Sequence, residues 1–140
     1  MNKQDKSPYV FQRNKIKNEL HIKKDIPWTK KQQDLIKLIL DKSTKVVMVR
    51  GVAGTTKTFT TMFAALELLN QKRVSDIILV RTAVESADSS LGFLPGDLQE
   101  KFGIYLTPFY DKLNELLPPN EIKFLESEDR LQMCPINFAR

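Results

Sequence analysis

Eight consecutive residues, 51–58, have the types and the order that bind phosphate groups. They read Gly-Val-Ala-Gly-Thr-Thr-Lys-Thr, follow the apolar run 46–49 (Val-Val-Met-Val) and precede a segment with helical periodicity. A nucleoside triphosphate crowds several negative oxygens into a small volume. Successive main-chain N–H groups in a tight loop, together with the positive end of a helix, bind such a group without burying many charges. Strand, glycine-containing loop and Lys-Thr at a helix start is the order of a phosphate-binding P-loop.

Each residue of this loop has an expected role. Glycines let the main chain approach the phosphates and take positive φ. Lys57 is expected to contact the β- and γ-phosphates, and the Thr58 hydroxyl is expected to be a Mg²⁺ ligand. The residues expected to cradle the phosphates are Gly51, Val52, Ala53, Gly54, Thr55 and Thr56.

Thr56 departs from the usual pattern, G-x-x-x-x-G-K-[ST], in which its position is the second glycine. A β-branched residue there strains the backbone by about 1–3 kcal/mol if the position needs φ > 0. Alternatively, the hydroxyl donates to a phosphate oxygen. The structural alternative for the whole motif is an ordinary Gly/Thr-rich turn before a helix.

Length and composition fit one globular domain with a modest core. The 140 residues are 41% hydrophobic and 28% charged, which is ordinary for a globular protein. No apolar run approaches the roughly 18–20 residues that cross a bilayer, and residues 1–7 lack the apolar stretch of a signal peptide. The lone Cys134 cannot form an internal disulfide, so we expect a cytoplasmic protein that contacts no membrane.

The positive charge is concentrated in residues 1–27, which carry seven basic against three acidic residues, a net of +4. We expect a basic, flexible N-terminal arm that either contacts nucleic-acid phosphates or is simply solvated. The folded domain is expected to occupy residues 28–140.

Periodicity predicts the elements of that domain. Thr29 and Gln32 form a capping box for a helix that continues to Asp41. A strand at 46–49, a helix at 57–70 and a buried strand at 77–80 would make a right-handed βαβ unit. Further along, we expect a helix from Leu98 to Leu117, kinked or divided by Gly103 and Pro108, and a short strand at Leu131–Cys134.

Four later segments, together with the loop, resemble the PhoH family of P-loop ATPases, which are cytoplasmic proteins of bacteria and phages. The most specific is Leu91–Lys101 (Leu-Gly-Phe-Leu-Pro-Gly-Asp-Leu-Gln-Glu-Lys), and Arg81–Glu85 matches the family's Arg-Pro-Ala-Val-Glu except at Thr82. Residues 105–111 and 134–140 resemble later family segments. The resemblance covers roughly residues 28–140.

The resemblance implies an α/β P-loop NTPase fold, here the N-terminal part of a RecA-like parallel sheet similar to superfamily 1 helicase motors and flanked by helices. It implies ATP and Mg²⁺ as cofactors and, in a complete protein, ATP hydrolysis coupled to RNA or single-stranded DNA. Assembly into a homo-oligomeric ring follows by analogy. In a phage, the setting would be the host cytoplasm.

One family element is missing before Arg140: the apolar strand that ends in Asp-Glu, the Walker B pair on which phosphoryl transfer depends. We therefore expect a truncated ATPase domain, inactive alone, with no catalytic residue assigned. The alternative is a nucleotide-binding module that never hydrolyses and regulates nucleic-acid or protein association. A small-molecule kinase would need a substrate lid, for which the sequence shows no candidate.

Three residues outside the loop have candidate roles that the resemblance implies. Gln32 either reads the adenine edge of ATP or only closes its capping box. Arg81 and Thr82 are expected to contact single-stranded nucleic acid, although Arg81 can equally pair with Glu85 or Asp88. Trp28 either stacks on adenine or packs where the first helix begins.

Overall fold

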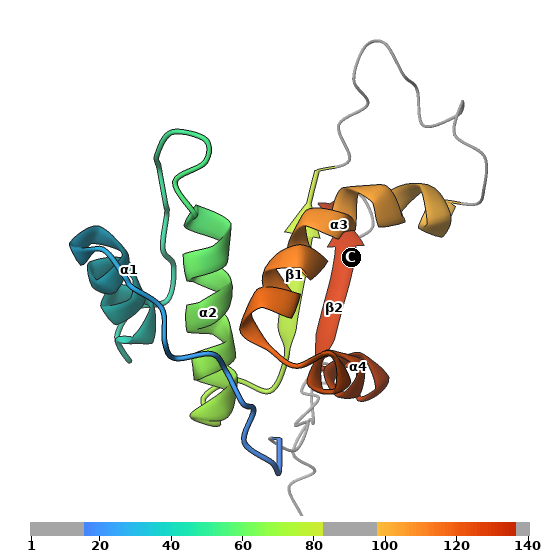
Figure 1. The fold of residues 1–140 in the computed structure, drawn as a ribbon, viewed down its shortest axis with the longest axis horizontal. Coiled ribbons are helices and arrows are strands. Elements are labelled where there is room, and N and C mark those ends of the chain that lie inside the picture. The colour runs from blue at the N-terminus through green and yellow to red at the C-terminus, as the bar shows by residue number, and fades with distance from the viewer. Residues whose placement is uncertain (1–15, 83–97, 137–140) are drawn as a thin grey trace, which may run out of the picture.

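The computed structural model describes residues 16–82 and 98–136, within which the chain forms four helices and two strands (Figure 1). At residues 98–102, 104, 105, 134 and 135 the structure describes the backbone but not the side chains. In chain order the elements are α1 (Lys30–Leu40), α2 (Lys57–Asn70), β1 (Ile77–Arg81), α3 (Leu98–Leu116), α4 (Pro119–Ser127) and β2 (Leu131–Pro135).

The two N-terminal helices form where local signals predict them. Thr29 is the N-cap of α1, and both arms of its capping box with Gln32 are present. Helix α2 begins at Lys57 and ends at Asn70, as its periodicity indicates, and its apolar face is buried in the core. Helix α1 packs against α2.

The sheet pairs two strands that are distant in sequence. Strand β1 lies parallel to β2, with Ile77 opposite Leu131 and Arg81 opposite Pro135. Parallel strands need a long crossover connection, and here it includes α3 and α4. The expected strands at 77–80 and 131–134 are thereby confirmed. Helix α3 continues through Pro108 without division, and α4, for which a proline at its first position is a usual signal, was not anticipated.

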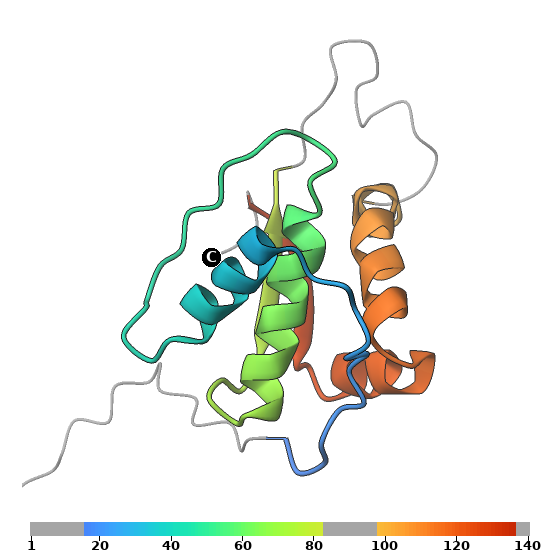
Figure 2. The ribbon, with the colours of Figure 1, turned by 60° about the vertical axis from the view of Figure 1, so that its left-hand side comes forward.

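The expected strand at 46–49 does not form, so the predicted βαβ unit with this segment as its first strand is wrong for the described residues. Residues 44–52 contain neither helix nor strand, and the side chains of Val46 and Met48 are 82% and 95% exposed. A strand exists only through hydrogen bonds to a neighbour, and β1 and β2 pair with each other. The segment instead runs as an irregular, exposed stretch beside α1 and α2 (Figure 2).

The helices cover only one face of the sheet. Ile77 and Leu79 of β1 pack against the core cluster, whereas Ile78 and Val80 are 59% and 45% exposed. The sequence predicted a buried strand at 77–80, and β1 is instead half-buried, with alternate side chains exposed.

Part of the expected N-terminal arm belongs to the core. Ile16, Leu20 and Ile22 are almost fully buried. The chain passes the junction of α3 and α4 and then crosses in front of α2 to reach α1 (Figure 2). The main chain of Leu20 forms two hydrogen bonds with the Asn70 side chain, of 2.7 and 2.9 Å, and Lys23 N–H donates to the Leu116 carbonyl at 2.9 Å. A flexible arm ending at residue 27 is therefore not what the structure shows for residues 16–26, and residues 1–15 lie outside the described part.

Within the described residues, no helix has the length and apolar character needed to span a membrane.

Candidate nucleotide-binding site

The loop at 51–58 lies at the end of the molecule toward which β1 and β2 point. Figure 1 shows it leading into the first turn of α2, at the same end as the carboxyl terminus of β1. Ligands of α/β proteins bind at this edge, where strands end and helices begin. The fold therefore places the loop where a phosphate site is expected.

Two residues of the loop have left-handed backbone conformations. Gly54 has φ +79°, which glycine adopts without strain. Thr56 has φ 56° and ψ 23°, so the position that is usually glycine does require φ > 0, and the strain expected there is present. Alternation of left-handed and ordinary residues turns successive N–H groups toward one side of a loop, which is how main-chain anion sites form.

Gly51 is needed for a different reason. A Cβ atom at this position would lie 3.3 Å from Thr55 Oγ1 and 3.6 Å from Lys57 Cδ. A side chain at this position would therefore crowd the Thr55 hydroxyl, which would have to shift by a few tenths of an ångström.

The Lys57 ammonium group bridges the two ends of the loop. Its Nζ donates to the carbonyl oxygens of Gly51 at 3.0 Å and Val52 at 2.6 Å, and to Thr55 Oγ1 at 3.2 Å. An ammonium group has three N–H donors, so a phosphate oxygen would replace one or more of these acceptors. The charge already lies over the concave main chain that a phosphate would contact.

The start of α2 is open to an anion. Its N-cap, Thr56, makes no side-chain capping hydrogen bond, and the first turn holds no acidic residue. The first N–H groups of a helix lack partners within it and carry the positive end of the helix dipole. Residues 42–66 contain Lys42, Lys45, Arg50 and Lys57 and no acidic residue, so the local charge is positive.

Gln32 reaches this loop from α1, which the sequence did not predict. Its Oε1 accepts from Thr29 N–H at 2.8 Å, which confirms the capping box, and its Nε2 donates to Thr56 Oγ1 at 2.6 Å. The two residues are 24 positions apart, and no sequence signal links them. The structure thus joins the candidate base-reading residue to the candidate phosphate loop.

Trp28 packs on α2. The centre of its ring lies 4.9 Å from the ring centre of Phe63 and 5.7 Å from that of Phe59, and the ring planes are tilted in both pairs. Of the two roles predicted for Trp28, the structure supports packing where α1 begins.

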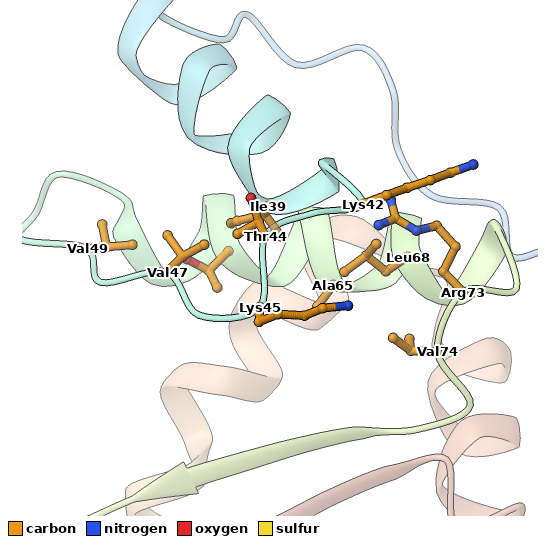
Figure 3. A pocket seen from close by; sticks show the side chains of 11 residues that line it. Ile39, Lys42, Thr44, Lys45, Val47, Val49, Ala65, Leu68, Arg73 and Val74 are labelled. Carbon is orange, nitrogen blue, oxygen red and sulfur yellow. The ribbon is translucent and has the colours of Figure 1, made fainter. Parts of the chain in front are cut away.

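A hollow lined by described residues lies apart from this loop. It measures about 430 Å³ and lies between the segment 44–49 and α2, with Thr44 and Val47 facing Ala65 and Leu68 (Figure 3). No residue of 51–58 lines it. The hollow is not a phosphate site. It lies on the side of α2 that residues 46–49 do not cover, because they form no strand there.

A profile of the PhoH-like protein family matches residues 25–140. The chain belongs to the PhoH family. It is 42% identical over 95 residues to a PhoH-like protein of Mycobacterium tuberculosis, covering 68% of this chain and 27% of the relative. It is 38% identical over 112 residues to a PhoH-like protein of Synechocystis, covering 80% and 33%, and 43% identical over 100 residues to Protein PhoH of Escherichia coli, covering 70% and 28%.

PhoH proteins are in general nucleotide-binding ATPases of the P-loop NTPase type. The resemblance found in the sequence is thus confirmed at the level of the family. The alignments span about a quarter to a third of the relatives' length.

The metal-binding side chains near the loop are few. Thr58 is exposed in the first turn of α2, and in the described part of the chain no three His, Cys, Asp or Glu residues cluster to hold a metal ion. Mg²⁺ in nucleotide sites keeps several waters and takes phosphate oxygens with only one or two protein ligands. One hydroxyl fits part of such a shell, and residues 42–66 supply no carboxylate to it.

Arg81 and Thr82 lie at the carboxyl end of β1, as predicted. The Arg81 guanidinium carbon is 5.8 Å from the centre of the Phe109 ring of α3, within the range of a cation–π contact. Glu85 and Asp88, its alternative partners, lie outside the described residues. The structure therefore places Arg81 at the sheet edge near α3 and leaves its predicted nucleic-acid contact a prediction.

Proposed function

We propose that this PhoH protein binds ATP, with residues 51–58 around the triphosphate and Gln32 at the adenine. The observation that carries this is the combination at one loop: left-handed Gly54 and Thr56, an α2 N-terminus without a cap, and Lys57 Nζ folded across the concave side. Each feature alone is common, but together they provide main-chain donors, a helix dipole and a cation for one polyanion.

In this proposal the chain's own groups divide the work of binding. Lys57 exchanges loop carbonyls for phosphate oxygens, the N–H groups of 54–58 donate to the phosphates, and the Thr58 hydroxyl is the protein ligand to Mg²⁺. The metal ion, when bound, would neutralise phosphate charge and orient the oxygens. The parallel pair β1–β2 would be part of a RecA-like sheet.

The parent activity that we propose is ATP hydrolysis coupled to RNA or single-stranded DNA. Arg81 and Thr82 would lie along the bound strand, on the edge that also carries the 51–58 loop. The second candidate is an ATP-binding module without hydrolysis, and it is supported by the strained, left-handed Thr56 at the position where the usual loop has glycine. Two findings separate these functions: whether the parent gene encodes an Asp-Glu strand after Arg140, and whether that longer protein releases phosphate at saturating ATP and RNA.

Nucleotide binding itself is tested by titrating ATP, ADP and GTP with and without Mg²⁺. Lys57→Ala should weaken ATP binding by about 10- to 100-fold, the equivalent of one or two charge-assisted hydrogen bonds. Lys45→Ala is the matched control, since it removes a lysine from the same basic region but outside the loop. Unchanged affinity in Lys57→Ala would remove the assignment.

A further inference from the structure

The Thr56 hydroxyl has a defined role in a hydrogen-bond network. It donates to the Thr55 carbonyl at 2.7 Å and accepts from Gln32 Nε2 at 2.6 Å. The hydroxyl proton is therefore used, and a lone pair is directed at Gln32. A glycine at this position would relieve the left-handed strain but would leave Gln32 without this partner.

The same network fixes which way the Gln32 amide faces. Thr29 N–H is a donor and must meet the amide oxygen, at 2.8 Å. The amide nitrogen must then face Thr56, because a flipped amide would direct N–H groups at the Thr29 N–H. Two anchors, one on α1 and one in the loop, hold the plane of the amide.

Among the described residues the anchored amide keeps one N–H and one oxygen lone pair without a partner, since a primary amide has two of each. Adenine offers a complementary edge, with a donor at N6 and an acceptor at N7, whereas guanine offers two acceptors, O6 and N7. The free amide edge therefore matches adenine and places its oxygen against the guanine O6. Rotation of the amide would remove this distinction.

We infer that Thr56 is a positioning residue for purine selection: its hydroxyl holds the Gln32 amide in the orientation that accepts adenine and rejects guanine. This inference rests on the proposed ATP binding at residues 51–58. It gives the departure from glycine a role in base choice that neither the usual loop pattern nor the capping box assigns. Through Thr56, base selection and the phosphate loop share one side chain.

The test compares dissociation constants for ATP and GTP in variants of residue 56. Thr56→Val removes the hydroxyl and keeps the branched shape, Thr56→Gly removes both hydroxyl and strain, and Thr56→Ser keeps the hydroxyl. Thr61→Val is the matched control, because the Thr61 hydroxyl donates to the Lys57 carbonyl within its own helix. The preference is the ratio of the GTP constant to the ATP constant.

We expect the wild-type chain to prefer ATP by about 5- to 100-fold, the range for one bidentate base contact. Thr56→Val and Thr56→Gly should lose most of this ratio and match Gln32→Ala, while Thr56→Ser and Thr61→Val should keep it. Adding Thr56→Val to Gln32→Ala should change the ratio no further. Relief of strain in Thr56→Gly can tighten both nucleotides, but it does not restore the ratio.

The inference is overturned if ATP binds and both Thr56→Val and Thr56→Gly keep the wild-type ratio, or if the wild-type chain binds ATP and GTP equally. If Thr56→Val fails to fold, Thr56→Gly decides alone. Absence of any nucleotide binding by the folded wild-type chain would instead refute the proposed function, and the inference with it.

Discussion

Substitution of Leu20 tests whether residues 16–26 are part of the folded core in solution. The Leu20 side chain is 5% exposed and belongs to the main apolar cluster. Truncation of a buried leucine to alanine removes its transfer free energy and leaves a cavity, at a cost of about 2–5 kcal/mol. If the segment were a solvated arm, the same change would cost less than about 0.5 kcal/mol.

The assay is urea denaturation of the wild-type chain, Leu20→Ala and the control Lys24→Ala, followed by circular dichroism. Lys24 is an exposed residue of the same segment, so its substitution should leave the free energy of unfolding within about 0.5 kcal/mol. If Leu20→Ala does not fold, Ile22→Val supplies a milder cavity worth about 0.5–1.5 kcal/mol. Equal stability of Leu20→Ala and Lys24→Ala would refute the packing of this segment.

Three further outcomes follow from the structure. Burial, followed by a hydrogen bond to Glu126, raises the pKa of Tyr110 from 10.0 to about 12. The contribution of Tyr110 to stability is therefore complete below pH 10 and is lost as pH rises through 12. In a spectrophotometric titration the tyrosine with the highest pKa should disappear in Tyr110→Phe, and three tyrosines that all titrate near pH 10 in the wild-type chain would contradict this. Gly51→Ala should weaken ATP binding about tenfold with unchanged helicity, because its Cβ would lie 3.3 Å from Thr55 Oγ1; equal affinity would show that the loop tolerates a side chain. Deletion of residues 1–15, which hold four basic residues, should reduce the slope of log affinity for single-stranded RNA against log salt by up to about 3, and an unaltered slope would separate this segment from RNA.

The parts of the fold that the sequence predicted are those with local causes. Helix α1 follows from the Thr29 cap and α2 from its apolar face, and both causes lie within the elements themselves. The run 46–49 has strand-forming residues, but a strand also needs a neighbour, and pairing is not encoded in the run. Residues 46–49 prefer the extended conformation, but among the described residues no neighbouring strand pairs with them.

The candidate site shows the same division. The order of 51–58 was sufficient to predict a lysine at the start of α2. It left open whether Thr56 needs a positive φ, and the structure answers with φ 56°. The hydrogen bond from Gln32 to Thr56 depends on how α1 packs against α2, which no spacing within either segment reveals. The burial of Leu20 was likewise unpredictable, because its partner Asn70 is fifty positions away.

The parallel ladder has a consequence for how a nascent chain acquires this fold. Ile77 must wait for Leu131, 54 residues later, before β1 gains its neighbour, and contacts of such separation form slowly. Helices α1 and α2 can pair as soon as residue 70 leaves the ribosome, but residues 16–28 then cover the apolar face of α2 only in part. During synthesis that face is exposed to chaperones and to other unfinished chains until α3, α4 and β2 arrive.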